Sequence, residues 1–297
     1  MIEFKKAILL FIFIFSSLFI GGAQCQPSIV FQDFSIVVSS SDKYRELWHP
    51  FFYFLFKNWP SLRQENSHIP IFLITSDMSY PDPRITVIKA GKSESWSTGI
   101  SKALNQVKTK YVLYLQEDFI IHYPIDEFSL EYFYKIMDKE KASYLELTFD
   151  SFFSNEPLHP VYQDIAIKNR FSEFRTALQA SFWDKSVFIS LLNVQENPWE
   201  FENYGSVRSQ KENYHFWIVQ KNHPIVYLNA CDRGYWNNAV LKYIQLQGIE
   251  IPVRRLPIDK DHSLIHWIKH YYPRIYKQLL NFDSLWLNNT MLRHENI

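Results

Sequence analysis

Short runs of apolar residues, bounded by serine, proline or charged residues, divide the first half of the chain. Four runs, at residues 34–39, 69–75, 85–89 and 111–115, are rich in β-branched and aromatic residues, and each has the length of a strand. Because these runs show little alternation of polar and apolar positions, they predict strands that are buried within a sheet.

Helical segments alternate with these strands. Asp42 can cap a helix over residues 44–59, which Pro50 either breaks or restarts as a second helical piece. A further helix is predicted over residues 96–106. The resulting order, β-α-β-β-α-β, is typical of a mostly parallel sheet flanked by helices, in which ligands bind beyond the carboxyl ends of the strands.

The second half of the chain has a less regular pattern. It predicts helices over residues 125–139 and 185–192, strands over 143–149 and 178–183, a loop at 197–199, and a last helix over 264–281 that Pro273 interrupts. We expect one large domain at residues 31–260, followed by a helical tail at residues 261–297.

The chain begins with a segment of a different kind. Lys5 and Lys6 precede an uncharged run, residues 7–23, that ends in small residues. This pattern predicts that residues 1–25 are a secretory signal peptide or a short membrane anchor, cleaved or retained, which would associate the chain with a membrane. The positive-inside rule places the body on the extracytoplasmic side, in a periplasm or a lumen, whereas an anchor inserted the other way would place it at the cytoplasmic membrane face.

Charge balance and cysteine content exclude several classes of protein. Lys+Arg and Asp+Glu each total 31, so the net charge is zero and no overall positive field would hold a nucleic acid. The two cysteines, Cys25 and Cys231, provide neither a disulfide framework nor a cysteine zinc site. The sequence also lacks a Gly-X-Ser-X-Gly elbow and a glycine-rich phosphate loop, which counts against hydrolases and kinases.

Two adjacent carboxylates, Glu117 and Asp118, follow the strand at residues 111–115. At that edge of a parallel sheet, they are placed to face a ligand. Mg²⁺ and Mn²⁺ bind such carboxylates together with phosphate oxygens, so the pair is a candidate site for a divalent cation. The alternative is a solvated acidic turn after a strand.

Two segments resemble the nucleotide-sugar half of GT-A-fold glycosyltransferases: residues 96–104 (Trp-Ser-Thr-Gly-Ile-Ser-Lys-Ala-Leu) and residues 111–118 (Tyr-Val-Leu-Tyr-Leu-Gln-Glu-Asp). In those enzymes a helix with a basic residue precedes a strand that ends in an Asp-X-Asp-type motif. Three more segments resemble a group of bacterial surface-polysaccharide glycosyltransferases: Ser-Ser-Ser-Asp-Lys-Tyr at 39–44, Asn-Pro-Trp-Glu-Phe-Glu at 197–202 and Arg-Gly-Tyr-Trp at 233–236.

The resemblance implies a GT-A-like, Rossmann-like sheet in a single catalytic domain, a nucleotide-sugar donor, and a metal role for Glu117 and Asp118. The chain departs from the family motif, because Gln116 stands where the motif has its first aspartate. This departure leaves open whether the activity depends on Mn²⁺ or Mg²⁺, and which carboxylate is the principal ligand.

The resemblance also implies contacts with the donor. It places Asp42 and Tyr44 beside the nucleotide base, and Trp96 and Lys102 near the ribose or the diphosphate. From the residues alone, Asp42 can equally be a helix cap, the two aromatics core residues, and Lys102 a solvated charge. Arg233 is a candidate for a diphosphate contact because a guanidinium group matches phosphate oxygens, with surface pairing as the alternative.

The segment at residues 197–202 supplies a candidate catalytic base. An inverting glycosyl transfer needs a group that accepts the proton of the acceptor hydroxyl, and a carboxylate can do so. Glu202 is the first candidate and Glu200 the second; on a helix they point in different directions, so only one can serve. The alternative is that both carboxylates complement the helix dipole.

These features predict a glycosyltransferase of the hexosyltransferase type, which moves a sugar with inversion from a nucleotide-diphosphate donor to a hydroxyl of a glycan or a lipid-linked acceptor. The alternative is an exported carbohydrate-binding or surface-interaction protein without turnover, because sugar nucleotides are made in the cytosol. A lumenal compartment would remove that conflict, and the sequon Asn288-Asn289-Thr290 could then be glycosylated.

Overall fold

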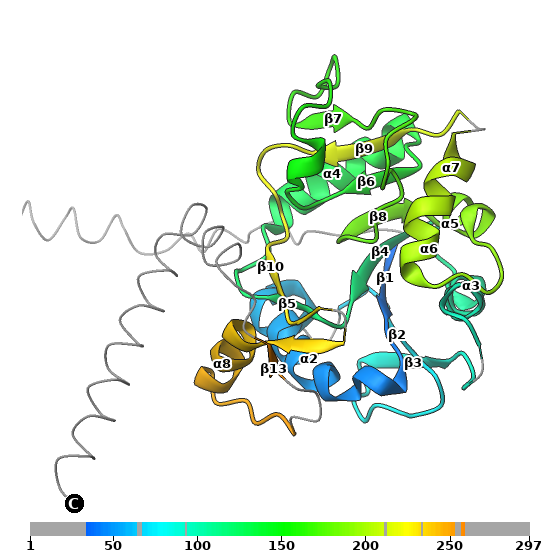
Figure 1. Cartoon of the computed structure of the whole chain (residues 1–297). Helices are drawn as coiled ribbons and strands as arrows, with labels where there is room; N and C mark the ends of the chain where they lie inside the picture. Colours follow the sequence, from blue (N-terminus) through cyan, green and yellow to red (C-terminus); the bar gives the residue numbers. More distant parts are fainter. Residues whose placement is uncertain are drawn as a thin grey trace, which may run out of the picture. The chain divides into compact units, whose positions relative to one another are not determined.

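The fold of the chain is known from a computed structural model (Figure 1). The described residues are 34–63, 67–92, 94–210, 213–232, 234–252 and 257–258. The fold is built on an eight-stranded sheet in the order β3-β2-β1-β4-β8-β6-β9-β7. The strands of this sheet are β1 (Phe34–Ser39), β2 (Ile71–Thr75), β3 (Ile85–Lys89), β4 (Tyr111–Gln116), β6 (Tyr144–Glu146), β7 (Ile165–Ile167), β8 (Ser181–Asp184) and β9 (Phe216–Val219).

Helices connect and cover these strands. They are α2 (Arg45–Asn58), α3 (Trp96–Gln106), α4 (Glu127–Glu140), α5 (Lys185–Leu191), α6 (Pro198–Glu200), α7 (Ser206–Ser209) and α8 (Asn238–Leu246). Within the described part of the chain, no helix has both the length and the apolar character needed to cross a membrane. The predicted segment at residues 1–25 and the predicted helical tail at residues 261–297 lie outside the described residues.

Four neighbouring strands, β3, β2, β1 and β4, are parallel. Ile36 of β1 pairs with Ile71 of β2 and with Leu113 of β4, and β2 pairs with β3 in the same orientation. Helix α2 connects β1 to β2, and α3 connects β3 to β4. The predicted order of the first half is confirmed, and α3 has the predicted bounds.

Helix α2 begins after a short 3₁₀ turn at Asp42–Tyr44 and continues through Pro50. The expectation that Pro50 would break or restart the helix was wrong. Pro50 is itself buried, and its neighbours Leu47 and Phe51 are at most 1% exposed. Burial of this apolar face outweighs the one backbone hydrogen bond that a proline cannot make.

The other half of the sheet is mixed. Strand β8 lies between β4 and β6 and is antiparallel to both, β9 is parallel to β6, and β7 is antiparallel to β9 at the edge. Six of the eight strands therefore run in one direction, which confirms a mostly parallel α/β sheet. The sequence pattern predicted β6 and β8 with longer bounds, and it did not predict β7 or β9.

Helices pack against both faces of this sheet. On one face, α3 and α5 belong to a buried cluster with Val37 and Trp183. On the opposite face, Tyr134 of α4 contacts Phe34 of β1 and Phe182 of β8, at ring-centroid distances of 5.4 and 5.7 Å. Alternate residues of β1 and β8 thus point to opposite faces, as the strand pleat requires.

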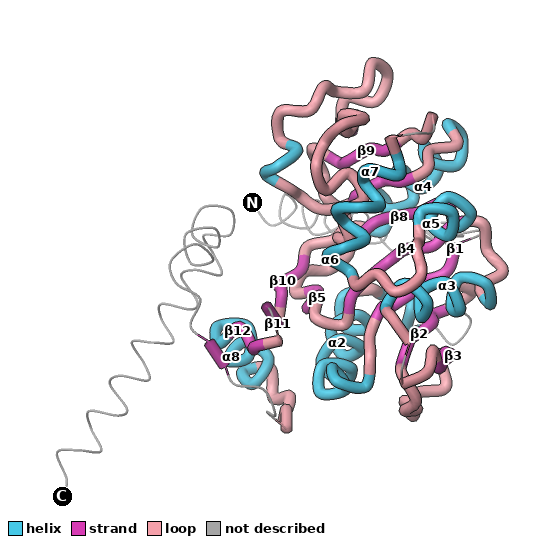
Figure 2. Tube along the Cα trace, turned by 45° about the vertical axis from the view of Figure 1, so that its right-hand side comes forward, coloured by secondary structure: helices cyan, strands magenta, loops and turns pink. Residues whose placement is uncertain are grey.

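A continuous helical stretch, α6, a π-helical turn at Phe201–Gly205 and α7, lies near β4 and β8 (Figure 2). The loop expected at residues 197–199 begins this stretch instead. The side chain of Asn197 accepts a hydrogen bond from the backbone N–H of Glu200, and Pro198 stands at the first helical position, where its missing N–H costs nothing.

Short strands outside the main sheet complete the edge at which β4 ends. They are β5 (Phe119–Ile121), β10 (Tyr227–Asn229), β11 (Cys231–Asp232), β12 (Tyr235–Asn237) and β13 (Pro257–Ile258). Strand β10 pairs with β5 in antiparallel orientation. The backbone N–H of Ala230 donates to the carbonyl of Asp118 at 2.8 Å, so residues after β10 lie against the turn that follows β4.

Candidate active site

A pocket of about 590 Å³ lies at the carboxyl ends of the parallel strands. The last residues of three strands line it: Ser39 of β1, Thr75 of β2 and Gln116 of β4. This is the edge at which ligands of parallel sheets bind, as the sequence pattern predicted.

The pocket includes the acidic turn between β4 and β5. Asp118 and Glu117 both line the pocket, and Glu117 is only 7% exposed. The turn is fixed because the Asp118 carbonyl accepts hydrogen bonds from the N–H groups of Ile120 and Ala230. Oδ1 of Asp118 is buried and has no hydrogen-bond partner among the described residues. Burial raises the pKa of Asp118 to about 7.

Glu202, from the π-helical turn, lines the same pocket. Its Oε1 accepts a hydrogen bond from the backbone N–H of Leu178 at 2.7 Å. Burial raises the pKa of Glu202, and the Leu178 N–H partly opposes this effect because it stabilises the carboxylate. The structure therefore brings Glu202 together with Asp118, although they come from different elements.

Glu200, the second candidate base, has a different environment. Its side chain is exposed and is not among the residues that line the pocket. Oε2 accepts a hydrogen bond from the backbone N–H of Asn197 at 2.8 Å, and the Glu200 N–H donates to the Asn197 side chain at 3.0 Å. This reciprocal pair is a capping box, which satisfies two N–H groups at the helix start.

Two of the four described residues proposed to contact the donor, Tyr44 and Trp96, line the pocket. Trp96 is held in place, because its Nε1 donates to Ser39 Oγ at 2.9 Å and its ring packs against Phe201 at a centroid distance of 5.3 Å. The indole face of Trp96 is thus fixed beside the end of β1.

Asp42 and Lys102 contact neighbouring loops. The carboxylate of Asp42 accepts hydrogen bonds from the backbone N–H groups of residues 76–78, just after β2, at 3.0 to 3.3 Å. Lys102 Nζ donates to the Ala90 carbonyl at 2.7 Å and to Glu94 at 2.8 Å. Both side chains hold loops that contribute to the pocket wall, and neither lines the pocket itself.

Arg233 lies outside the described residues, between Asp232 and Gly234, which line the pocket. Asp232 and Asn229 also line the pocket, but the short strands that position them show no strand pattern in the sequence. Ser40 and Ser41 line it too, and their place directly after β1 is the same signal that pointed to Glu117 and Asp118 after β4.

The carboxylates of the pocket suit a cation that is held partly by the protein and partly by the substrate. Among the described residues, no group of three or more His, Cys, Asp or Glu side chains is arranged to hold a metal ion. Mg²⁺ and Mn²⁺, however, bind through one or two carboxylates together with substrate phosphates and water. The buried Oδ1 of Asp118, which has no hydrogen-bond partner in the described part of the chain, fits such a site beside Glu117.

Comparisons of sequence with known proteins give no relative: no protein-family model and no curated protein matches the chain. Several solved structures have a similar fold. Residues 1–349 of S. aureus TarS superpose with a TM-score of 0.46 at 11% identity, covering 75% of this chain and 67% of that one. The mannosyltransferase PcManGT from Pyrobaculum calidifontis, in complex with GDP-Man and Mn²⁺, gives 0.45 at 9% identity, covering 72% and 61%.

A third similar structure is a cytidylyltransferase from Leptospira borgpetersenii, with a TM-score of 0.41 at 10% identity, covering 73% of this chain and 95% of that one. Glycosyltransferases and a nucleotidyltransferase thus occur among the similar structures. Because the TM-scores are below 0.5, the ligand of this chain has to be inferred from the residues of its own pocket.

Proposed function

We propose that this chain is a glycosyltransferase, which transfers a sugar from a nucleoside-diphosphate donor to an acceptor hydroxyl. The observation that supports this most is that Asp118 and Glu202, two carboxyl groups whose pKa values burial raises, line one pocket at the carboxyl edge of the sheet. In such a pocket, the carboxylate of Asp118 can assist the departure of a diphosphate, and the carboxylate of Glu202 can accept a proton.

On the donor side, we assign the nucleoside to the surface formed by Tyr44 and Trp96, because their rings offer apolar faces to a base or a ribose. The hydroxyl groups at residues 39–41 provide hydrogen-bond partners within the same pocket. Asp42 and Lys102 contribute by holding the adjacent loops.

Asp118 and Glu117 would hold a divalent cation, Mn²⁺ or Mg²⁺, together with the donor diphosphate. When bound, the cation neutralises charge that develops on the leaving diphosphate. Asp118 has to release its proton before it binds a cation. Because the pKa of Asp118 is raised to about 7, cation affinity should fall as the pH falls below about 7.

Glu202 is proposed to accept the proton of the acceptor hydroxyl. The hydroxyl oxygen forms a bond with the anomeric carbon of the donor sugar. At the same time the bond between that carbon and the diphosphate oxygen breaks, and the electron pair of the broken bond leaves with the diphosphate. The raised pKa makes Glu202 a stronger base near neutral pH. Leu178 N–H occupies Oε1, so we assign Oε2 to the hydroxyl. Attack opposite the leaving group gives inversion.

The acceptor is proposed to be a glycan or a lipid-linked sugar, and the transferred group a hexose. Trp199 lines the pocket and is 61% exposed, so its indole face is available to a sugar ring at the rim.

The segment at residues 1–25 supports export or membrane anchoring of the body. Protection of the body from protease in sealed vesicles would support this location, and cleavage from the cytosolic side would contradict it.

A donor screen tests the proposal. The purified chain is incubated with a panel of sugar nucleotides and simple glycan acceptors, with Mn²⁺, Mg²⁺ or EDTA, and the release of nucleoside diphosphate is measured. We expect turnover with at least one donor. In Glu202→Gln we expect turnover about 10² to 10⁴ times slower, with donor affinity within about threefold of wild type.

Glu200→Gln is the matched control, because it makes the same chemical change two residues away and a glutamine can still close the capping box. It should turn over within about threefold of wild type. Sugar binding without turnover of any donor would favour the non-catalytic carbohydrate-binding alternative. A slow Glu200→Gln beside a normal Glu202→Gln would assign the base to Glu200.

A further inference from the structure

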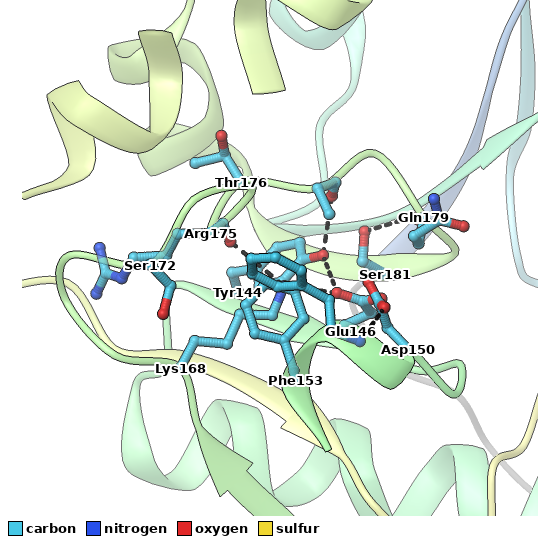
Figure 3. A network of polar contacts seen from close by, with 12 residues as sticks. Tyr144, Glu146, Asp150, Phe153, Lys168, Ser172, Arg175, Thr176, Gln179 and Ser181 are labelled. Carbon is cyan, nitrogen blue, oxygen red and sulfur yellow. Dashed lines mark hydrogen bonds and ion pairs between the residues drawn. The ribbon is translucent and has the colours of Figure 1, made fainter. Parts of the chain in front are cut away.

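A network of polar contacts surrounds Tyr144 and Glu146 (Figure 3), and one of its residues, Gln179, also lines the pocket. Lys168 Nζ donates to Glu146 Oε2 at 2.6 Å, and both side chains are 0% exposed. The Lys168 ammonium also lies over the Phe153 ring, 3.9 Å from its centroid. Neither Lys168 nor Glu146 lines the pocket, so the pair has no direct access to a ligand there.

Tyr144 extends this network toward the pocket. Its hydroxyl lies 3.0 Å from Glu146 Oε2 and 2.8 Å from the Ala177 carbonyl oxygen. A phenol has one proton for these two acceptors. The shorter of the two distances assigns this proton to the Ala177 carbonyl. The Tyr144 ring is itself fixed, stacked on Phe216 at a centroid distance of 5.2 Å.

The peptide group between Ala177 and Leu178 then reaches Glu202. Its carbonyl accepts from Tyr144, and its N–H, which belongs to Leu178, donates to Glu202 Oε1 at 2.7 Å. Since a peptide group is planar and trans, a hydrogen bond that orients its carbonyl also orients its N–H. The Leu178 carbonyl is held separately by Gln116 Nε2 at 2.9 Å.

We propose that Tyr144 is a positioning residue for Glu202, acting through the Ala177–Leu178 peptide group, with the Lys168–Glu146 pair as its anchor. The catalytic consequence of this inference rests on the proposed function, whereas the coupling itself does not. Loss of the Tyr144 hydroxyl should let the peptide rotate, weaken the Leu178 N–H bond to the carboxylate, and raise the pKa of Glu202 further.

Other ionisable groups also act on Glu202 and must stay constant in the test. Glu146 and Asp150 raise its pKa, Lys168 lowers it, and the phenols of Tyr114 and Tyr144 lie within its electrostatic reach. A Tyr144→Phe substitution leaves all four of the other groups in place, so a changed titration of Glu202 would report the lost hydroxyl.

The sequence offers a selective probe of this peptide group. Ala-Leu occurs only at Ala103–Leu104 and Ala177–Leu178, so labelling alanine with ¹³C at the carbonyl and leucine with ¹⁵N gives two paired NMR signals. Leu104 lies buried in α3 and serves as an internal reference. The Leu178 amide shift is followed against pH in the full chain with EDTA, for wild type, Tyr144→Phe and Tyr111→Phe.

Tyr111→Phe is the matched control, because Tyr111 is also a buried tyrosine. Its hydroxyl donates to Asp138 at 3.1 Å, and Tyr111 begins β4, whereas the pocket lies where β4 ends. In Tyr144→Phe we expect the midpoint of the Leu178 titration to rise by about one pH unit. In Tyr111→Phe it should stay at the wild-type value. Equal midpoints in all three proteins, or equal shifts in both variants, would overturn the inference.

Wild type and Glu202→Gln provide a second test, which stands even if Tyr144→Phe does not fold. The Ala177 carbonyl carbon should titrate with the same midpoint as the Leu178 amide, and both titrations should vanish in Glu202→Gln. A carbonyl that does not respond would overturn the coupling.

A turnover measurement separates this inference from the proposed function. We expect Tyr144→Phe to lower kcat about tenfold with little change in donor KM, and to move the acidic limb of the kcat profile upward with the Leu178 midpoint. A shifted Leu178 midpoint in a chain that transfers no sugar would support the coupling and overturn only the proposed function.

Discussion

Asp118 and Glu146 are both buried acids whose pKa values burial raises, but their surroundings differ. Glu146 Oε2 accepts a hydrogen bond from Lys168, its Oε1 has no hydrogen-bond partner among the described residues, and the side chain does not line the pocket. Asp118 lines the pocket, and no cationic side chain is bonded to it within the described residues. A buried acid with its own base has its charge compensated within the fold, whereas a buried acid that faces a pocket without one is suited to bind a ligand.

The largest expected effect follows from the role proposed for Asp118 as a ligand of the cation. Asp118→Ala should lower glycosyl transfer at least about 10⁴-fold, equivalent to about 5 kcal/mol, without lowering the melting temperature at pH 8. Turnover and thermal unfolding are measured on the same preparation. Asp138→Ala, which removes an exposed carboxylate, should leave transfer unchanged. Near-normal turnover of Asp118→Ala with donor and metal would remove Asp118 from the reaction.

The next effect tests the structural role of the buried pair. Lys168→Met leaves Glu146 without its base and should lower the free energy of unfolding by about 3 to 5 kcal/mol. Lys168→Met combined with Glu146→Leu removes both charges and should restore most of that loss. Lys110→Met, which removes the same group from an exposed pair with Asp138, should cost less than about 1 kcal/mol. Urea unfolding provides the three values, and a mild Lys168→Met would show that the pair does not anchor the fold.

A smaller effect should appear in the dependence of stability on pH. The pKa of Asp118 is about 7 in the folded protein, against 3.8 ordinarily, so between about pH 4 and pH 7 the folded state binds more protons than the unfolded state. Stability therefore falls as the pH rises through this window. Asp118→Asn lacks this titration and should exceed wild type by about 4 kcal/mol at pH 8 in EDTA, with the advantage lost at pH 4.

Addition of Mn²⁺ at pH 8 to the same stability measurement tests cation binding by Asp118 without any need for turnover. The cation should raise the stability of wild type and leave that of Asp118→Asn unchanged, because the amide provides a much weaker ligand. An equal effect of Mn²⁺ on both proteins would place cation binding elsewhere.

The fold of the first half was predictable from sequence because its strands are continuous apolar runs in a parallel sheet and its connecting helices have the expected period. The second half was only partly predictable. Strands β7 and β9 are short, at three and four residues, and long-range pairing sets them more than local pattern does. Pro50 misled the prediction, because burial around α2 overrides the helix-breaking effect of proline.

The site was predictable where side chains follow directly from a strand end, as with Glu117 and Asp118. Glu202 was proposed as a base from its chemistry and lines the pocket, but the hydrogen bond from the Leu178 N–H that orients it joins distant segments and leaves no trace in the local sequence. The same holds for Asp42 and Lys102. Their side chains could bind either a ligand or a neighbouring loop, and only the folded structure shows that they bond to loops.

The smallest expected effect concerns Glu200, which shares a helical segment with Glu202 but faces the helix start. Glu200→Ala removes one half of the capping box and should lower the free energy of unfolding by about 0.5 to 1 kcal/mol, because the Asn197 N–H then bonds only to water. Glycosyl transfer should remain within about threefold of wild type, since this carboxylate does not line the pocket. Urea unfolding and turnover separate the two roles. A large loss of turnover at unchanged stability would show that Glu200 acts on the ligand, and the contrast between the two glutamates would fail.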